Sequence, residues 1–147
     1  MRAVLQRVLR ASVEVEERTV GTIEHGLLVL LAVEKDDTQA EADWIAGKIA
    51  ALRIFEDDER KMNRSVLEVG GSVLLISQST LAADCRKGRR PGFDKAADPE
   101  QAKPMIAHTK KTLEAAGLVV AEGEFGAHMK VELLNDGPVT IVLERRP

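Results

Sequence analysis

The 147-residue chain is 44% hydrophobic and 31% charged, with 21 Lys and Arg against 24 Asp and Glu and a formal net charge of −3. This length and apolar content suit a single domain over residues 1–147 with a hydrophobic core of its own. The slightly acidic balance excludes attraction of nucleic acid by a positive charge spread over the whole surface, so any such contact has to be local.

The single cysteine, Cys85, cannot form an intrachain disulfide. The stretch MRAVLQRVLRASVEVEE carries charges every few residues, whereas a signal peptide has an unbroken apolar core. No apolar run approaches the length that spans a membrane. We therefore expect a cytoplasmic protein without membrane contact.

The first third of the chain predicts strands. In AVLQRVLRASVEVEE, Val13 and Val15 alternate with Glu14 and Glu16, the period of a strand with one buried face. The run GLLVLLAV, which begins at Gly26, is apolar throughout and predicts a strand that is buried on both faces.

A helix is predicted next, because Thr38 and Glu41 have the spacing of a capping box. Ile45, Ile49 and Leu52 follow at the i, i+4, i+7 spacing of one apolar helix face.

EDDERKMNRS predicts an exposed charged connection, Gly70 and Gly71 predict a turn, and Ser72–Ile76 predicts a buried strand. This strand leads into hydroxyl and amide side chains, which are Ser77, Gln78, Ser79 and Thr80. A loop that satisfies its own backbone would explain such a cluster, and so would a reactive site.

CRKGRRPGFDKAADP predicts an irregular loop that holds the densest basic cluster of the chain. Asp98 then predicts the N-cap of a second helix, with Pro99 at its first position and Gly117 as its stop. The apolar stripe of this helix consists of Ala102, Met105, Ile106, Thr109 and Leu113. Pro104 either bends the helix or delays its start.

HMKVELLNDGPVTIVLE predicts two strands joined by a turn at Asn135–Pro138. The mixed order of strands and helices predicts an α/β (mixed α and β) fold class. We expect a largely β sheet or open barrel with two main helices packed on one side.

The three histidines, His25, His108 and His128, are scattered, and no Cys-x-x-Cys or His-x-x-x-His spacing occurs. We therefore predict neither a metal nor another cofactor. Cys85 lies beside Arg86 and Lys87, but without a His or Asn in a recognisable relation to it we interpret it as a structural or surface cysteine.

Four segments, LLISQSTLAAD, RRPGF, GEFGAHM and LLNDGPVTIVLE, occur in an order and at a spacing that resemble the D-aminoacyl-tRNA deacylase family. The similarity covers essentially the whole chain. It implies an enzyme that hydrolyses the ester between a D-amino acid and the 3′ end of tRNA, as chiral proofreading in translation. It also implies aminoacyl-tRNA as the partner, no cofactor, and the fold of that family.

By this resemblance, Thr80, Gln78 and Ser77 are the catalytic residues at the scissile ester. Hydrolysis of an ester builds negative charge on the carbonyl oxygen, which hydrogen-bond donors at a strand end can stabilise. Thr80 is either a nucleophile or a positioning group. Because no His or carboxylate stands beside it in sequence, we favour positioning, with the terminal 2′-hydroxyl of the tRNA assisting.

An enzyme that removes only D-amino acids has to accept any side chain and still reject the L enantiomer. A rigid segment of backbone can do this by steric exclusion of an L side chain. In the family, the residues matching Gly137 and Pro138 are joined by a cis peptide and their carbonyls hold the α-amino group. This pair reaches into the active site of the partner subunit, which implies an obligate homodimer. Glycyl-tRNA has no side chain to exclude and is expected to be hydrolysed to some extent.

The resemblance assigns substrate binding also to Phe125, Met129 and Asn135, with Phe125 stacking on the terminal adenosine. The alternative for Phe125 is an ordinary core residue. Contacts with acceptor-stem phosphates are assigned to the basic loop residues Arg86, Lys87, Arg89 and Arg90.

The sequence departs from the family pattern at Ser79, where Phe is common, and at Gly92, where Ser is common. An alternative function is a non-catalytic nucleic-acid-binding module on the same scaffold, for which the basic loop and Phe125 would suffice.

Overall fold

The computed structural model describes residues 1–147. Its strands are β1 (Arg2–Val15), β2 (Arg18–Ile23), β3 (Gly26–Ala32), β4 (Phe55–Glu56), β5 (Met62–Arg64), β6 (Ser72–Ser77), β7 (Val120–Glu122) and β8 (Lys130–Glu144). Its helices are α1 (Gln39–Ala51), the short 3-10 helix η1 (Ser79–Ala82) and α2 (Pro99–Ala115).

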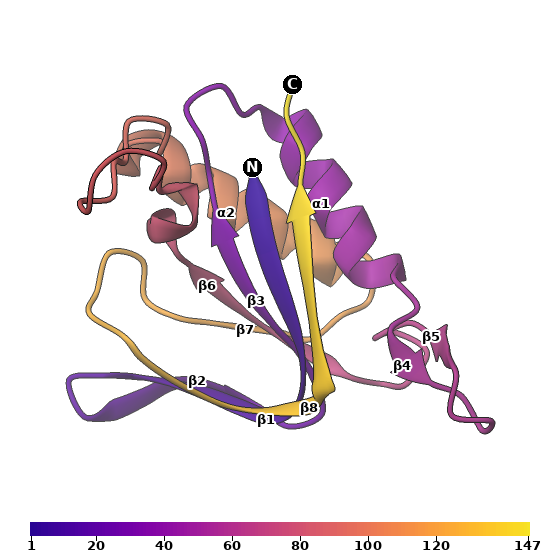
Figure 1. Cartoon of the computed structure of the whole chain (residues 1–147). Helices are drawn as coiled ribbons and strands as arrows, with labels where there is room; N and C mark the ends of the chain where they lie inside the picture. The colour runs from indigo at the N-terminus through magenta and orange to yellow at the C-terminus, as the bar shows by residue number, and fades with distance from the viewer.

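The main sheet is organised around β1, which pairs with β3 and β2 in succession and with β8 along nearly its whole length. The strand order is β2-β1-β3-β6-β7, with β8 attached to β1. At the far side β7 returns to β2, where a Cβ on Gly21 would lie 2.5 Å from the carbonyl oxygen of Glu122. The sheet therefore curls into a nearly closed barrel (Figure 1).

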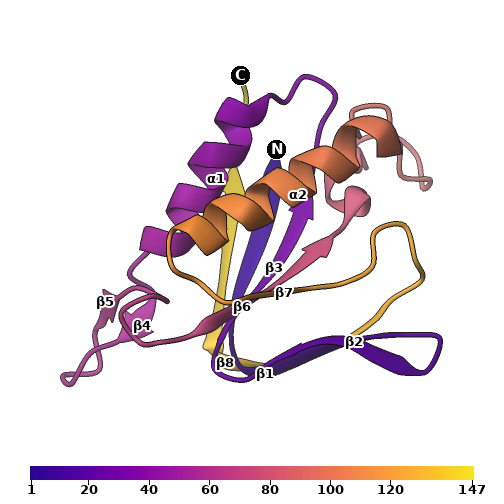
Figure 2. The same cartoon turned by 180° about the vertical axis from the view of Figure 1, so that it is seen from behind.

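Both long helices cover one side of the sheet (Figure 2). Between them and the sheet lies a core of 20 buried residues, to which β3 contributes Leu27, Val29 and Leu31. The alternate residue Leu28 joins a smaller cluster inside the curl of the sheet. β3 is thus buried on both faces, and the predicted class, a largely β open barrel with two helices on one side, is confirmed.

The predicted start of α1 and both predicted ends of α2 are confirmed, whereas Leu52, predicted on the apolar face of the first helix, lies one residue beyond its end. The capping box of α1 is formed, since Thr38 N donates to Glu41 Oε2 at 2.7 Å and the Thr38 hydroxyl accepts from Ala40 N. In α2 the Asp98 side chain accepts from Gln101 N, and the chain leaves the helix through Gly117 at φ +102°. Pro104 lies inside α2, so it does not delay the start of the helix. Neither helix has the length and apolar composition needed to cross a bilayer.

The predicted hairpin at Asn135–Pro138 is wrong. Both halves of β8 pair with the same strand, because β1 is 14 residues long and can accommodate them end to end. Leu134 lies opposite Arg10, and Thr140 opposite Gln6, so the residues between them exceed the space on β1. They loop out as a bulge, here called the 136–139 bulge, instead of reversing the chain.

Several other elements were not predicted, which are β2, the short helix η1, the β4–β5 hairpin and β7. The charged connection after α1 contains the β4–β5 hairpin, whose turn is organised by the Asp57 carboxylate. That carboxylate accepts from Glu59 N at 2.8 Å and from Lys61 N at 3.0 Å. The short strand β7 extends the main sheet beside β6.

Candidate functional site

The polar segment after β6 stands at the carboxyl end of that strand. Gln78 N donates to the carbonyl of Leu31 at 2.8 Å, which anchors the segment to the neighbouring strand β3. The chain then turns at once into η1, with Gln78 at its N-cap position. Ser79 and Thr80 therefore occupy the first two positions of a helix, where backbone N–H groups have no intrahelical acceptor.

A hollow of about 670 Å³ opens beside this segment. Its wall contains five of the predicted site residues, which come from two distant parts of the chain: Ser77, Gln78, Thr80, Phe125 and Met129. Ser79, the position that departs from the family pattern, is also part of the wall. We call this hollow the candidate pocket.

Within the candidate pocket, the Gln78 side-chain amide donates to the Thr80 hydroxyl oxygen at 3.2 Å. This oxygen has no hydrogen bond with a histidine or a carboxylate. Since the hydroxyl accepts from Gln78, its own proton is free to be donated to another group. The arrangement resembles a donor site rather than an activated nucleophile.

The loop that carries Phe125 is packed closely against the sheet. Gly123 N donates to the carbonyl of Leu75 at 3.1 Å. A Cβ on Gly123 would lie 2.6 Å from the sulfur of Met129 and 3.0 Å from Ile76, so no larger residue fits without displacing this wall. Phe125 is half-buried and packs against the main core on one side while lining the candidate pocket on the other.

The remaining wall residues were not predicted from the sequence. They are Val33, Ile76, Ala96, Ala97, Pro99, Ala102, Gly126, Ala127, His128 and Val131. Most are small or apolar, and nothing in their local sequence distinguishes them from core residues. His128 is the one whose chemistry could have identified it.

Gly137, Pro138 and Asn135 do not line the candidate pocket of their own chain. The Gly137–Pro138 peptide is cis, as the resemblance implied, and both residues are exposed at the tip of the 136–139 bulge. The amide of Asn135 closes the neck of the bulge, because its oxygen accepts from Val139 N at 2.9 Å and its nitrogen donates to the Thr140 hydroxyl at 3.1 Å.

Arg7, which was not predicted, supports the bulge from below. Its side chain is 5% exposed and donates to the carbonyls of Asp136 at 3.1 Å and Ile54 at 2.9 Å. The carboxylate of Asp136 lies 3.4 Å from the guanidinium. Arg7 follows Ala3 and Leu5 at every second position along β1, so its side chain points to the same buried face of the sheet. A charged residue at such a core position was the feature of the sequence that could have identified Arg7.

The basic loop, residues 85–91, is closed by a pair of backbone hydrogen bonds. Asp84 N donates to Gly92 O at 2.7 Å, and Gly92 N donates to Asp84 O at 2.9 Å. Arg86 makes a two-point contact with the Asp84 carboxylate, at 2.9 Å through Nε and 2.7 Å through Nη2. This guanidinium, together with the Arg86 backbone N–H, holds the pKa of Asp84 well below its usual range.

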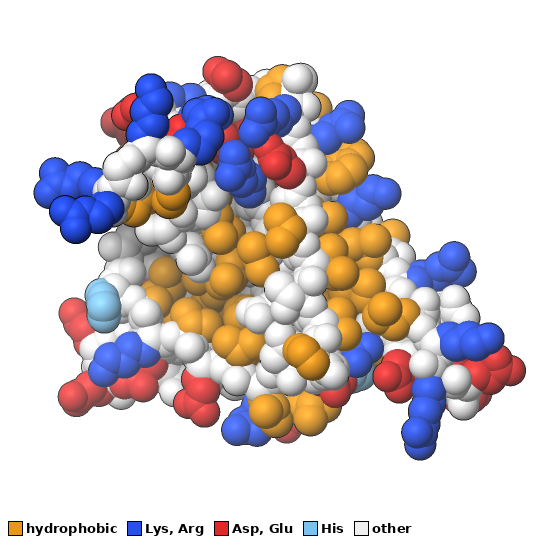
Figure 3. Space-filling view, viewed as in Figure 1, with side chains coloured by type: hydrophobic (Ala, Val, Ile, Leu, Met, Phe, Trp, Pro, Cys, Tyr) orange, Lys and Arg blue, Asp and Glu red, His pale blue; other side chains and the backbone are white.

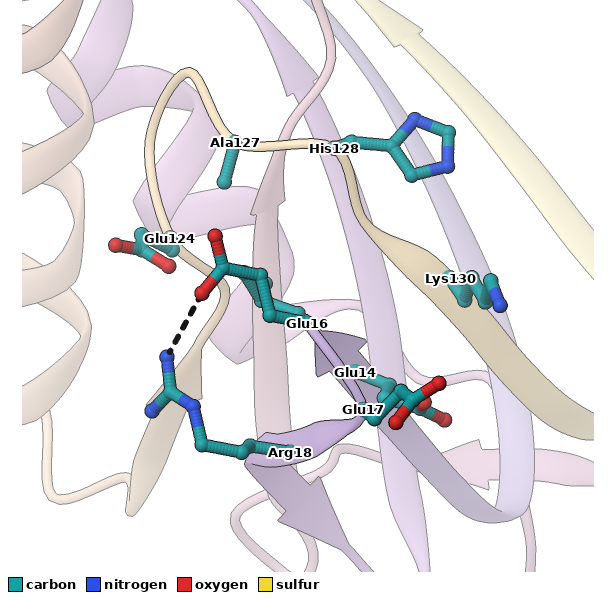
Figure 4. Close-up of a pocket in the computed structure, with 9 residues that line it drawn as sticks. Glu14, Glu16, Glu17, Arg18, Glu124, Ala127, His128 and Lys130 are labelled. Carbon is teal, nitrogen blue, oxygen red and sulfur yellow. Dashed lines mark ion pairs between the residues drawn. The ribbon is translucent and has the colours of Figure 1, made fainter.

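A second hollow lies beside the β1–β2 turn and shares Ala127 and His128 with the candidate pocket. Figure 4 shows its four carboxylates, Glu14, Glu16, Glu17 and Glu124, with Arg18 paired to Glu16 at 3.9 Å. In Figure 3, Lys and Arg gather at the upper left, on the side of the basic loop, and Asp and Glu at the lower left. A polyanion is therefore attracted to only one side of the candidate pocket.

The face of the sheet that points away from the helices carries a broad area of hydrophobic side chains (Figure 3). Ile141 and Leu143 of β8 pack toward the helices, so Val142 between them points to this open face and is 69% exposed. β8 is paired with β1 alone, which leaves its other edge free. Long free edges and exposed apolar areas are typical of surfaces that bind another chain.

The family model for D-Tyr-tRNA(Tyr) deacylase matches residues 4–144. A protein of Symbiobacterium thermophilum named D-aminoacyl-tRNA deacylase is 56% identical over 98% of this chain and 95% of its own. A solved structure named c-Myc DNA Unwinding Element Binding Protein has a TM-score of 0.93 at 40% identity, over all of both chains. A probable eukaryotic D-amino acid tRNA deacylase, at 18% identity and a TM-score of 0.82 over 97% of each chain, shares the fold.

Proposed function

Because the chain belongs to the D-Tyr-tRNA(Tyr) deacylase family, we propose that it hydrolyses the ester between a D-amino acid and the 3′ end of tRNA and leaves the L-aminoacyl ester intact. The observation that carries this proposal is the match of the family model over residues 4–144. Such an enzyme works where aminoacyl-tRNA is made and used, which agrees with the cytoplasmic location predicted from the sequence.

The candidate pocket supports a mechanism by positioning. When water attacks the ester, negative charge develops on the carbonyl oxygen, and donors that are already oriented stabilise it. The N–H groups at the start of η1 and the Thr80 hydroxyl, which Gln78 orients at 3.2 Å, are suitable donors. Without a neighbouring base on Thr80, the proton transfer falls to the terminal 2′-hydroxyl of the tRNA and to water.

Chiral selection is assigned to Gly137 and Pro138, whose backbone would hold the amino group and exclude an L side chain. Since neither residue lines the pocket of its own chain, the assignment requires a second subunit. The exposed position of the 136–139 bulge, the free edge of β8 and the apolar face beside it support a homodimer in which each bulge enters the partner's pocket.

The direct test is to incubate the purified protein with matched D- and L-aminoacyl-tRNA, and with glycyl-tRNA, and to follow release of the amino acid. We expect loss of the D ester without added metal, survival of the L ester, and partial loss of the glycyl ester. Thr80→Ala should lower the rate by about a hundred- to a thousandfold, because one of the oriented donors is lost, whereas Thr19→Ala, at an exposed position of β2, should leave the rate unchanged. Equal loss of D and L esters, or inhibition by a chelator, would contradict the proposal.

The shared site is tested separately by mixing subunits. Thr80→Ala and Gly137→Trp should each inactivate the homodimer, one through the pocket and the other through the bulge. In their heterodimer, a shared arrangement places both lesions in one site and leaves the other intact, so about half of the activity should return. A properly exchanged heterodimer without activity would show that each chain supplies its own complete site.

A second candidate is nucleic-acid binding without catalysis, which the name of the 40% identical solved structure favours. Lys87, Arg89 and Arg90 could supply the phosphate contacts. A pure binder, however, needs no oriented hydroxyl like that of Thr80. Parent protein that binds nucleic acid and releases no amino acid from D-aminoacyl-tRNA would favour this second function.

A further inference from the structure

The basic loop contains four cationic side chains, and only one of them, Arg86, forms an ion pair. Arg86 is held by the Asp84 carboxylate through Nε and Nη2, and Asp84 also accepts from the Arg86 backbone N–H at 3.1 Å. No ion pair or hydrogen bond engages the side chains of Lys87, Arg89 and Arg90, all of which are exposed. The cluster therefore consists of one ion-paired cation and three cations without a partner.

Asp84 is also the residue at which the basic loop closes, through its paired backbone hydrogen bonds with Gly92. The Asp84 carboxylate thus connects Arg86, at the start of the loop, to the residue whose backbone closes the loop. A guanidinium–carboxylate pair with two parallel contacts fixes direction as well as distance. The Asp84–Arg86 pair consequently restricts how residues 87–90 project from the protein.

The loop continues directly into the wall of the candidate pocket at both ends. On one side, Ala83 N donates to the carbonyl of Thr80 at 3.1 Å. On the other side, Ala96 N donates to Phe93 O and Ala97 N to Val33 O, and both alanines line the pocket. The direction of the loop is therefore set relative to the site of the ester.

We propose that Asp84 and Arg86 form a latch that positions the basic loop, so that Arg86 is a positioning residue and the phosphate contacts are made by Lys87, Arg89 and Arg90. This inference rests on the proposed function for its ligand, the acceptor stem of tRNA. The strongly lowered pKa of Asp84 agrees with it, because the hydrogen bonds from Arg86 that lower this pKa are the same contacts that form the latch.

The latch and a simple phosphate contact predict opposite signs for one substitution. Asp84→Asn removes a negative charge from a basic cluster, so if attraction of phosphate alone mattered, tRNA would bind more tightly. If Asp84 positions the loop, the same substitution frees Arg86 and loosens the loop, and tRNA binds more weakly. Exposed ion pairs are modest, so we expect a weakening of about two- to fivefold.

The experiment measures binding of deacylated tRNA as a function of salt for the parent, Asp84→Asn, Arg86→Gln and Lys87→Gln. Lys111→Gln, at an exposed position in the last turns of α2, is the control for loss of one charge. Lys87→Gln should reduce the salt slope by about one unit, whereas Arg86→Gln should weaken binding with an unchanged slope. Melting temperatures verify that every variant is folded.

Tighter or unchanged binding by Asp84→Asn would overturn the latch, and so would a salt slope of Arg86→Gln that falls like that of Lys87→Gln. The measurement requires no turnover, so it is independent of catalysis. A parent protein that binds tRNA but releases no D-amino acid would overturn the proposed function alone. A parent that hydrolyses the D ester while Asp84→Asn binds more tightly would overturn the latch alone.

Discussion

Gly137→Ala is the substitution whose effect follows most directly from the geometry of the 136–139 bulge. Gly137 has φ +136°, which residues with a side chain rarely adopt. A Cβ at this position would lie 2.7 Å from Val139 Cγ2, 2.9 Å from Val139 N and 3.2 Å from the guanidinium of Arg7. Since one of these atoms is backbone and another belongs to a buried side chain, the bulge itself has to move.

The cost in stability can be estimated from these contacts. A residue with a side chain in such a backbone conformation costs about 1–3 kcal/mol. Loss of the hydrogen bond from Val139 N to Asn135 would add about 1 kcal/mol. Because the bulge is exposed and can relax, we expect a loss of about 2–3 kcal/mol in the free energy of unfolding. This corresponds to a decrease of about 6–9 °C in Tm for a chain of this size.

The effect on hydrolysis should be larger than the effect on stability. If the backbone of Gly137 and Pro138 holds the amino group, a displacement of about 1 Å can reduce the rate by about a hundredfold. The control is Gly70→Ala, because Gly70 also has a positive φ, +67°, but a Cβ there would meet nothing within 4 Å. Gly70→Ala should lower Tm by a few degrees and leave hydrolysis unchanged.

The assay compares release of the D-amino acid from D-aminoacyl-tRNA by the parent and both variants, at a temperature well below every Tm. Hydrolysis by Gly137→Ala at the rate of the parent would refute the role assigned to the bulge. An equal loss in Gly70→Ala would attribute the effect to stability instead.

Three other substitutions test separate parts of the structure. Phe125→Ala should raise KM about tenfold with kcat little changed, because stacking on a base is worth about 1–3 kcal/mol, and an unchanged KM would contradict the stacking role. Glu41→Gln should lower Tm at pH 7, because the hydrogen bonds from Thr38 lower the pKa of folded Glu41 from 4.5 and the ionised carboxylate therefore stabilises the fold. This stabilisation is lost as Glu41 is protonated, so the difference in Tm from the parent should shrink as the pH falls below 4.5. A difference that stays constant with pH would refute this. If the proposed homodimer forms, Val142→Asp should convert it to folded monomers without hydrolytic activity, as light scattering and the deacylation assay would show, and an active monomer would refute the shared site.

The features predicted correctly from the sequence are those that a few neighbouring residues determine. The start of α1 depends on Thr38 and Glu41, whose side chains and backbone satisfy each other within four residues. The polar segment of the candidate pocket follows its strand in the chain, so its place at the end of β6 was also predictable. Phe125 was assigned to the same site only through the resemblance, because no local pattern joins it to Thr80.

The 136–139 bulge could not be predicted because its local sequence suits a chain reversal equally well. Asn-Asp-Gly-Pro favours a turn wherever it occurs, and only the partner strand decides whether the chain folds back. Here β1 is long enough to pair with both halves of β8, so the extra residues protrude. Arg7 supports them from a strand 129 residues away from Asp136, a contact that no local pattern contains.

The position of the bulge on β8 also bears on how two subunits could build one site. Val142 of β8 points to the open apolar face, and Gly137 lies five residues away on the same strand. A partner that covers this face would be fixed relative to β8, and Arg7 and Asn135 fix the bulge relative to β8 in turn. The contact that forms the dimer would therefore also set how far the bulge reaches. For this reason, dimer formation and hydrolysis of the D ester should be lost together when the face is disrupted.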